Sequence, residues 1–115
     1  MIEQHLIGNR DGLTVEPRPE RDRVVVAVEG ELDLATVGIV EREVDELYGS
    51  GWKRVVLDLR DVAFIDSTGL RLLIRLDGRA RGGGRGFAIV EGDGSVRRLL
   101  ALTGLGARFE RAALH

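Results

Sequence analysis

Two short runs of aliphatic residues, at positions 24–28 and 55–59, constrain the fold of this chain more than any other feature. The first run reads Val-Val-Val-Ala-Val and the second reads Val-Val-Leu-Asp-Leu, so each is nearly unbroken by polar residues. Runs of this kind are typical of strands that are covered on both faces within a sheet. The sequence therefore predicts two buried strands, and the first of them is expected to be central in the sheet.

Segments with helical periodicity alternate with these strands. A first helix is predicted from about position 36 to a Gly-Ser-Gly break at 49–51, with charged residues 41–43, 45 and 46 mostly on its outer side. Its apolar residues recur at helical spacing: Val37, Val40, Val44, Leu47 and Tyr48. A second helix is predicted to run to about position 81, with these residues at one buried spacing: Gly69, Leu72, Leu73, Leu76 and Ala80.

Weaker signals complete the order of elements. A strand is predicted at 13–16 and is expected to end at Pro17 and Pro19, which cannot donate to a neighbouring strand. A third buried strand is predicted at 87–90, followed by a turn at 92–94 and a helix capped by Ser95. A short apolar stretch to 109 is a candidate for a further edge strand. The predicted fold class is α/β, with a mixed, mostly parallel sheet of four to five strands, packed helices and right-handed crossovers.

The length of 115 residues suits one domain with one hydrophobic core. Composition agrees, because 43% hydrophobic and 31% charged residues is a usual balance for a soluble globular protein. We expect a single domain over 1–115, in which residues 1–12 form a loose lead-in and residues 110–115 form a short C-terminal tail.

Charge and hydropathy argue against two classes of partner. The formal net charge is −2, and no basic block could follow a phosphate backbone, so we expect no direct binding of nucleic acid. No segment approaches the roughly 20 apolar residues that span a bilayer, and the first residues lack the apolar core of a signal peptide. We therefore expect no membrane association and a cytoplasmic location.

Catalytic and metal-binding chemistry is not supported by the residue content. A serine nucleophile needs a base, but the two histidines, His5 and His115, lie at opposite ends of the chain. The chain has no cysteine, and Asp58 and Asp61 are interpreted as solvated carboxylates at a strand end. The glycines at 82–86 lack the Lys-Ser/Thr ending of a phosphate-binding loop and indicate a flexible connection. The sequence thus predicts no enzymatic activity, no cofactor and no metal.

The most informative segment is Phe-Ile-Asp-Ser-Thr-Gly-Leu at 64–70, where a buried strand reaches a turn and a helix begins. One interpretation is structural: Ser67 or Thr68 caps the helix, as Asp33 or Thr36 is expected to cap the first one. Asp66 would then complement the helix dipole. The other interpretation is regulatory, because a phosphate on Ser67 is tolerable at a helix start but adds about −1.5 to −2 units of charge against a docked partner.

This motif and its surroundings resemble the STAS domain family, specifically the bacterial anti-sigma factor antagonists. The strand at 55–59 and Phe-Ile at 64–65 precede an Asp-Ser-Thr-Gly-Leu motif that is similar to the phosphorylation segment of the family. The upstream Gly-Glu-Leu-Asp-Leu-Ala-Thr at 30–36 resembles the family segment before its first helix, and 99–105 resembles its late helix and turn. The similarity covers about 13–109, most of the chain.

The resemblance implies a binding domain without catalytic activity whose serine phosphoacceptor corresponds to Ser67. It also implies a partner, an anti-sigma factor that is itself an ATP-dependent serine kinase. The unphosphorylated antagonist binds this kinase and releases the sigma factor, phosphorylation ends the binding, and a metal-dependent serine phosphatase restores it. By position, these residues are expected to belong to the docking surface: Asp33, Thr36, Asp66, Thr68, Gly69, Leu70 and Arg71.

Two alternatives stay open. A STAS domain could instead be an accessory module of a lipid transporter or of a stress-signalling assembly, in which Ser67 and Thr68 serve only as caps and contacts. The same turn could also belong to a small-ligand or nucleotide sensor. The chain departs from many relatives at Arg71, where a small residue is common, and this difference bears on which partner fits.

Overall fold

The computed structural model describes residues 12–114, which form a five-stranded sheet, three α-helices and one 3-10 helix. In chain order the elements are β1 (Leu13–Pro19), β2 (Val24–Leu32), α1 (Val37–Gly49), β3 (Arg54–Ile65), α2 (Ser67–Gly82), β4 (Gly86–Val90), α3 (Ser95–Thr103), the 3-10 helix η2 (Gly106–Arg108) and β5 (Glu110–Arg111). The predicted lead-in at 1–12 lies outside the described residues except for its last member.

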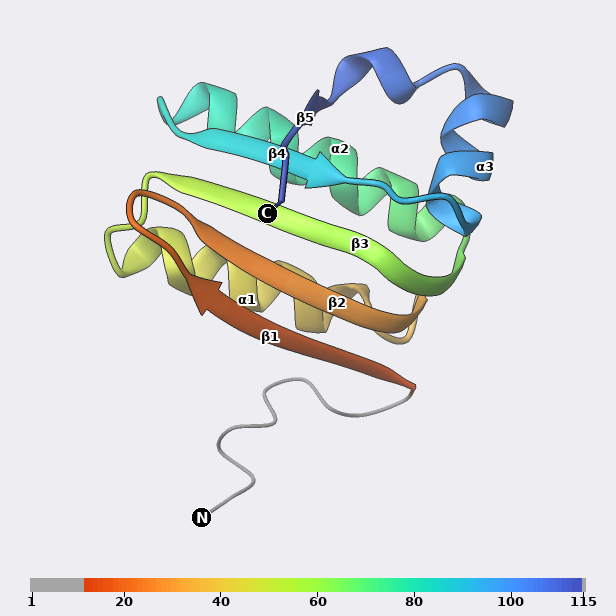
Figure 1. The fold of residues 1–115 in the computed structure, drawn as a ribbon, viewed down its shortest axis with the longest axis horizontal. Helices are drawn as coiled ribbons and strands as arrows, with labels where there is room; N and C mark the ends of the chain where they lie inside the picture. The colour runs from red at the N-terminus through yellow and green to blue at the C-terminus, as the bar shows by residue number, and fades with distance from the viewer. Residues whose placement is uncertain (1–11, 115) are drawn as a thin grey trace.

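The strands lie across the sheet in the order of the sequence, β1-β2-β3-β4-β5. β1 and β2 form an antiparallel hairpin, whereas each later strand runs parallel to the one before it. A parallel neighbour requires a crossover, and α1 supplies it between β2 and β3 while α2 supplies it between β3 and β4 (Figure 1). The predicted α/β class with a mixed, mostly parallel sheet is confirmed.

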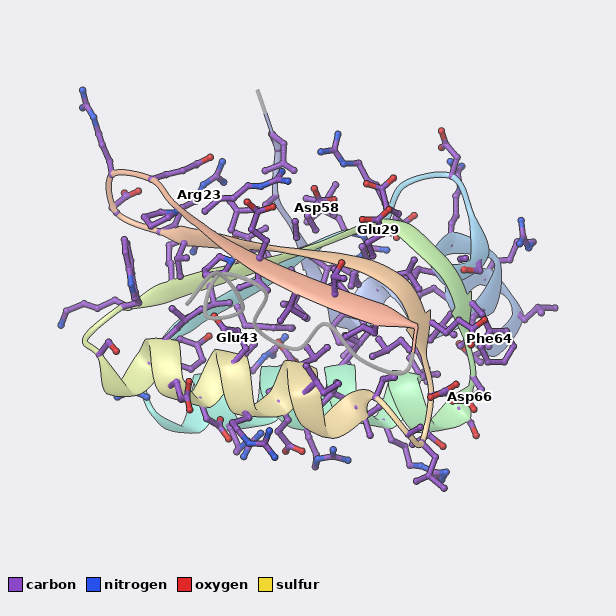
Figure 2. All side chains as sticks on the ribbon, turned by 90° about the horizontal axis from the view of Figure 1, so that it is seen from below. Arg23, Glu29, Glu43, Asp58, Phe64 and Asp66 are labelled. Carbon is purple, nitrogen blue, oxygen red and sulfur yellow. The ribbon has the colours of Figure 1, made fainter. Side chains whose placement is uncertain are left out.

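The main core lies between one face of the sheet and the helices. Figure 2 shows α1 and α2 along this face, with the opposite face of the sheet turned away from them. The largest fully buried side chains of this core include Val24, Val26, Leu57, Leu59, Leu72, Leu73 and Leu76. Each aliphatic side chain buried in this way contributes about 1.5 to 3 kcal/mol relative to leaving it exposed, so the helical faces predicted from spacing hold the fold together.

The opposite face of the sheet carries a smaller apolar strip of buried residues: Val25, Val56 and Ala88. Ala112 and Leu114 of the C-terminal tail pack against this strip. Arg23 holds the tail there, because its Nη2 donates to the carbonyl oxygen of Ala113 at 3.0 Å. The strands formed by the two aliphatic runs are therefore covered on both faces, by helices on one face and by this short tail on the other.

The prediction that the first strand already ends at Pro17 is wrong, because β1 includes Pro17 and ends at Pro19. β1 is an edge strand and pairs only with β2. The N–H of Glu31 donates to the carbonyl oxygen of Gly12 at 3.0 Å, which places the even-numbered residues of β1 in the hydrogen-bonded pairs. The odd-numbered prolines therefore lie where a backbone donor would point away from β2, and the ladder loses nothing.

The prediction that Ser95 caps α3 is also wrong, since Gly94 is the N-cap and Ser95 is the first helical residue. The Ser95 hydroxyl donates instead to the carbonyl oxygen of Val62 at 2.8 Å. This bond anchors α3 to β3. At its other end α3 is closed by Gly104, which has a φ of 72° and so takes the left-handed conformation of a C-terminal glycine.

Asp58 does not lie at a strand end but in the middle of β3, where it is 5% exposed. Both of its carboxylate oxygens accept hydrogen bonds from Arg60 at 2.9 Å, on the face of the sheet turned away from the helices (Figure 2). Burial alone would raise the pKa of Asp58, but the bonds from Arg60 hold that pKa below its ordinary value. The interpretation of Asp58 as a solvated carboxylate was therefore wrong.

Glu43 of α1 was expected on the outer side of its helix, but it lies in the interior with 4% of its surface exposed. Figure 2 places it between α1 and the sheet. Burial, and secondarily the nearby charge of Glu46, raises the pKa of Glu43. The helix therefore buries an acid among its apolar residues, so the stability of the chain is expected to depend on pH.

Candidate docking site

The carboxyl ends of β2 and β3 lie together at one end of the sheet. The two strands are parallel, and Leu32 at the end of β2 is paired in register with Ile65 at the end of β3. The loop 33–36 follows β2, and α2 begins almost immediately after β3, so both segments project from this place. We call the loop 33–36, Phe64 and residues 66–71 the Ser67 end; Phe64 and Asp66 mark it in Figure 2.

Asp66, rather than Ser67 or Thr68, caps α2. Its backbone is still extended, with φ −116° and ψ −169°, and its Oδ1 accepts from the N–H of Thr68 at 2.9 Å and from that of Gly69 at 3.2 Å. The predicted cap was therefore wrong by one or two residues. A carboxylate in this position both satisfies N–H groups and complements the helix dipole, and such caps typically contribute about 1 kcal/mol.

Ser67 is the first residue of α2, and its side chain is exposed. Thr68 beside it is only partly exposed. Because Asp66 has taken over the capping of the helix, the fold does not need the Ser67 hydroxyl for this purpose. The hydroxyl is therefore accessible to another protein, which is the first requirement for a phosphoacceptor.

Gly69 allows the first turn of α2 to lie directly on the ends of the strands. It is buried, and a β-carbon at this position would stand 2.7 Å from Cγ1 of Ile65. Real β-carbons do not approach other atoms so closely, so any side chain here would displace the helix or the strand. Gly69 therefore sets how near Ser67 lies to the sheet.

Thr36 closes the loop between β2 and α1. Its hydroxyl is completely buried, donates to the carbonyl oxygen of Glu31 at 2.8 Å and accepts from the N–H of Asp33 at 3.0 Å. Asp33 in turn accepts from the N–H of Ala35 at 3.0 Å. Thr36 occupies the N-cap position of α1 but forms no side-chain cap, so the capping predicted for Asp33 or Thr36 is not formed. These bonds instead hold the loop in one shape at the Ser67 end.

The predicted docking residues are brought to the same end of the molecule, but only some of them reach the surface. Exposed or partly exposed are Asp33, Asp66, Ser67, Thr68 and Arg71. Buried are Thr36, Gly69 and Leu70. The buried group can shape the surface but offers a partner little side-chain area. The docking role of every one of these residues stays a prediction.

Two apolar side chains at the Ser67 end were missed as candidate site residues. Leu34 is 79% exposed and Phe64 is 48% exposed. Large apolar side chains that are exposed to solvent near a candidate site are typical of protein interfaces. A signal was present in the sequence, because Leu34 stands in a short loop with no element to cover it.

Ion pairs join the outer faces of α1 and α2 but do not extend to the start of α2. Arg75 lies 3.1 Å and Arg79 lies 2.7 Å from carboxylate oxygens of Glu41, and Arg79 also lies 3.5 Å from Asp45. The hydrogen bond from Arg75 is the main reason that the pKa of Glu41 is lowered. Arg71, one turn before Arg75, is exposed and has no ion pair with any residue between 12 and 114.

The Ser67 end contributes no residue to the hollow that lies between the later turns of α1 and α2. This hollow is lined by other residues: Asp45, Tyr48, Leu76, Arg79, Ala80 and Arg85. Within residues 12–114, no group of three or more histidines and acids could hold a metal ion. No α-helix in this part of the chain is long and apolar enough to cross a membrane.

A sequence model of one protein family, described as "Mlab, STAS domain", matches residues 15–111. This span takes in the whole sheet except the first two residues of β1, and all three α-helices. It also includes the complete Ser67 end. The match therefore covers the fold and the candidate site together.

Individual relatives match over a similar span. The chain is 30% identical over 94 residues to an anti-sigma F factor antagonist of Paenibacillus polymyxa. This alignment covers 81% of this chain and 80% of that protein. It is 29% identical over 99 residues to the anti-sigma-F factor antagonist RsfB of Mycobacterium tuberculosis, covering 86% and 80% of the two chains. The crystal structure of an anti-sigma factor antagonist from Mycobacterium paratuberculosis aligns with a TM-score of 0.78 at 29% identity, over 93% and 92% of the chains.

Proposed function

The chain belongs to the STAS domain family, and on that premise we propose that it is an anti-sigma factor antagonist controlled by phosphorylation of Ser67. In this proposal the unphosphorylated chain uses the Ser67 end to bind an anti-sigma factor that is also a serine kinase, and this binding releases the sigma factor. Phosphorylation ends the binding, and a serine phosphatase acting on the phosphorylated form restores it. The chain acts as a regulated binding protein and not as an enzyme.

The position of the Ser67 hydroxyl is the observation that carries this proposal. Ser67 is the first residue of α2 and is exposed. It lies next to Asp66, at the same end of the molecule as the exposed Leu34 and Phe64. A kinase can reach the hydroxyl, and a docked partner would cover it. A single modification at this place therefore lies within the surface that the partner needs.

Phosphorylation of Ser67 is a transfer of the γ-phosphoryl group of ATP. Ser67 Oγ attacks the γ-phosphorus, the new Oγ–P bond forms as the bond from this phosphorus to the β–γ bridging oxygen breaks, and ADP leaves. The hydroxyl proton passes to a base. We assign that base to the kinase, because no hydrogen bond joins Ser67 Oγ to a base among residues 12–114, and Oδ1 of the neighbouring Asp66 accepts from the N–H groups of Thr68 and Gly69.

The added charge explains why the fold would survive while the complex would not. A phosphate carries about −1.5 to −2 units of charge, and in the uncomplexed domain water and the positive end of the α2 dipole stabilise it. In a complex, Leu34 and Phe64 would exclude water, and the repulsion between this phosphate and Asp66 would be stronger. Each increment of about 1.4 kcal/mol weakens binding tenfold, so a cost of a few kcal/mol is enough to release a micromolar complex.

The exposed and the buried members of the site have different tasks in this proposal. Asp33, Asp66, Thr68 and Arg71 would touch the partner directly, since each has accessible side-chain surface. Another group would act by holding the loop and the helix start in place: Thr36, Gly69 and Leu70. Substitutions in the two groups are therefore expected to differ, because the second group, together with the helix cap Asp66, should change the stability of the chain as well as binding.

The test is phosphorylation by the anti-sigma kinases of the genome that encodes this chain. The purified protein is incubated with each kinase and Mg-ATP, the modified hydroxyl is mapped by mass spectrometry, and co-elution of the two proteins is measured before and after. We expect one phosphate on Ser67 and loss of co-elution, with Thr68→Ala still modified and Ser67→Ala not. Persistent co-elution of the fully modified protein, or modification elsewhere, would contradict the proposal.

A further inference from the structure

The outer face of α2 carries three arginines spaced one turn apart, and only two of them have acidic partners within residues 12–114. Arg75 and Arg79 both contact Glu41 of α1, at 3.1 Å and 2.7 Å. Arg71 stands at the N-terminal end of this row and is exposed. It is also the single cation of the Ser67 end as defined above. Its guanidinium is therefore available to an anion that arises there.

Ser67 and Arg71 are four residues apart at the start of the same helix. Residues at this spacing lie on one face, with β-carbons about 5 to 6 Å apart, and an acidic group placed N-terminal to the basic one is the favourable order. A guanidinium presents its donors in a planar fork that matches two phosphate oxygens. A phosphate on Ser67 would therefore lie within reach of Arg71 and in a suitable orientation.

The backbone at the start of α2 has few donors left for such a phosphate. Asp66 Oδ1 accepts from the N–H groups of Thr68 and Gly69, and the N–H of Leu70 donates to the Asp66 carbonyl oxygen at 3.0 Å. The carboxylates of Asp66 and Asp33 at this end also repel an anion. Among the side chains of the Ser67 end, Arg71 is the one whose charge attracts a phosphate.

We propose that Arg71 binds the phosphate of phosphorylated Ser67 within the same chain and so clamps it against α2. This inference rests on the proposed phosphorylation of Ser67, and it adds how the modified state is held. The clamp changes the Ser67 end at two positions at once. An anion replaces the hydroxyl, and the cation one turn further along the helix is neutralised and withdrawn from any partner.

The test uses protein in which phosphoserine is inserted at position 67 during translation, so that no kinase is needed. Its second phosphate pKa, ordinarily about 6, is measured by phosphorus NMR in the otherwise unchanged chain and in Arg71→Gln and Arg75→Gln. We expect a pKa in the unchanged chain that is lower than in Arg71→Gln by about 0.3 or more, as an ion pair of this spacing provides. Arg75→Gln serves as the matched control and should titrate like the unchanged chain.

Two results would overturn the clamp. One is the same phosphate pKa with and without Arg71, and the other is an equal rise in Arg71→Gln and Arg75→Gln, which would indicate a general effect of the arginine row. Partial recovery of the lowered pKa in Arg71→Lys would support a charge at this position. Since the phosphate is inserted without a kinase, this measurement stands even if no kinase is found to modify Ser67.

Discussion

A β-carbon on Gly69 would stand 2.8 Å from the carbonyl oxygen of Leu32, so the first turn of α2 rests directly on the end of β2. The contact joins the two segments of the Ser67 end, because the loop 33–36 begins immediately after Leu32. The distance between that loop and Ser67 is therefore set by the absence of a side chain at one position.

Gly69→Ala is expected to destabilise the chain by about 1 to 3 kcal/mol, because the added methyl group must push α2 away from the strands. The same change should weaken partner binding by moving Ser67 relative to the loop. Gly78→Ala is the matched control on the same helix, where an added β-carbon meets no atom within 4 Å. We expect the control to raise stability by about 0.5 to 1 kcal/mol, as glycine is a poor helix former. Urea unfolding followed by circular dichroism measures the unfolding free energy of both variants. A Gly69→Ala variant as stable as the unchanged chain would contradict the close contact at Gly69.

Charge at position 67 is expected to control binding. Ser67→Ala should bind the anti-sigma kinase whether or not ATP is present, since it has no hydroxyl to modify. Ser67→Asp and Ser67→Glu should bind about tenfold or more weakly, and less weakly than the phosphorylated chain, because each adds one charge instead of nearly two. Ser50→Asp, at an exposed site just past the far end of α1, is the control and should bind normally. Equal affinity of all the Ser67 variants would favour the alternative of a STAS module that is not switched at this serine.

The exposed apolar side chains at the Ser67 end are expected to be anchors for the partner. Leu34→Ser and Phe64→Ser should each reduce affinity for the kinase about tenfold or more. The unfolding free energy should change by about 0.5 kcal/mol or less for Leu34→Ser and by about 1 kcal/mol for Phe64→Ser, because Phe64 is half buried. Leu102→Ser provides the comparison, because Leu102 is 85% exposed on α3 and lies outside the Ser67 end. Calorimetric titration of each variant measures the affinity. Similar losses in all three variants would argue against a localised docking surface.

Glu43 is expected to make stability depend on pH in a defined direction. Burial raises its pKa above the ordinary value of 4.5, so folding favours the protonated form. The contribution of this group is fully present below 4.5 and is lost as pH rises through the higher pKa of the folded state. Glu43→Gln removes the charge but keeps the shape, and should therefore be more stable than the unchanged chain at neutral pH.

The gain from Glu43→Gln should shrink as the pH falls below 4.5, where both side chains are neutral in either state. Urea midpoints at neutral pH and at about pH 4 give the comparison. Glu46→Gln, at an exposed position of the same helix, should give a smaller gain. A gain for Glu43→Gln that did not vary with pH would show that shape, and not charge, explains the change.

Element order followed from the sequence because the aliphatic runs and the helical spacing agree with each other. The interior position of Glu43 could have been found from spacing alone, since it stands three residues after Val40 and four before Leu47 on the same helical face. Its charge argued for the surface, and tertiary packing overrode that preference. The passage of β1 through Pro17 required knowledge of which residues face the neighbouring strand, and composition does not contain it.

The location of the candidate site followed from the sequence, but its atomic arrangement did not. Asp66, Ser67 and Thr68 can each cap a helix, and only the extended backbone of Asp66 decides between them. Burial of Thr36 was likewise hidden, because its hydroxyl is satisfied by Glu31, which belongs to the preceding strand. Such contacts depend on how the loop returns across the strand ends, which local patterns do not specify.

The two prolines of β1 have an effect beyond their own strand. Four residues of β1, at 13, 15, 17 and 19, direct their backbone groups away from β2. Two of the four are prolines and have no N–H to donate to a further strand. A second molecule that approached along this border could not extend the sheet without leaving its own backbone acceptors unmatched. Pairing between copies of the chain along this border of the sheet is therefore disfavoured.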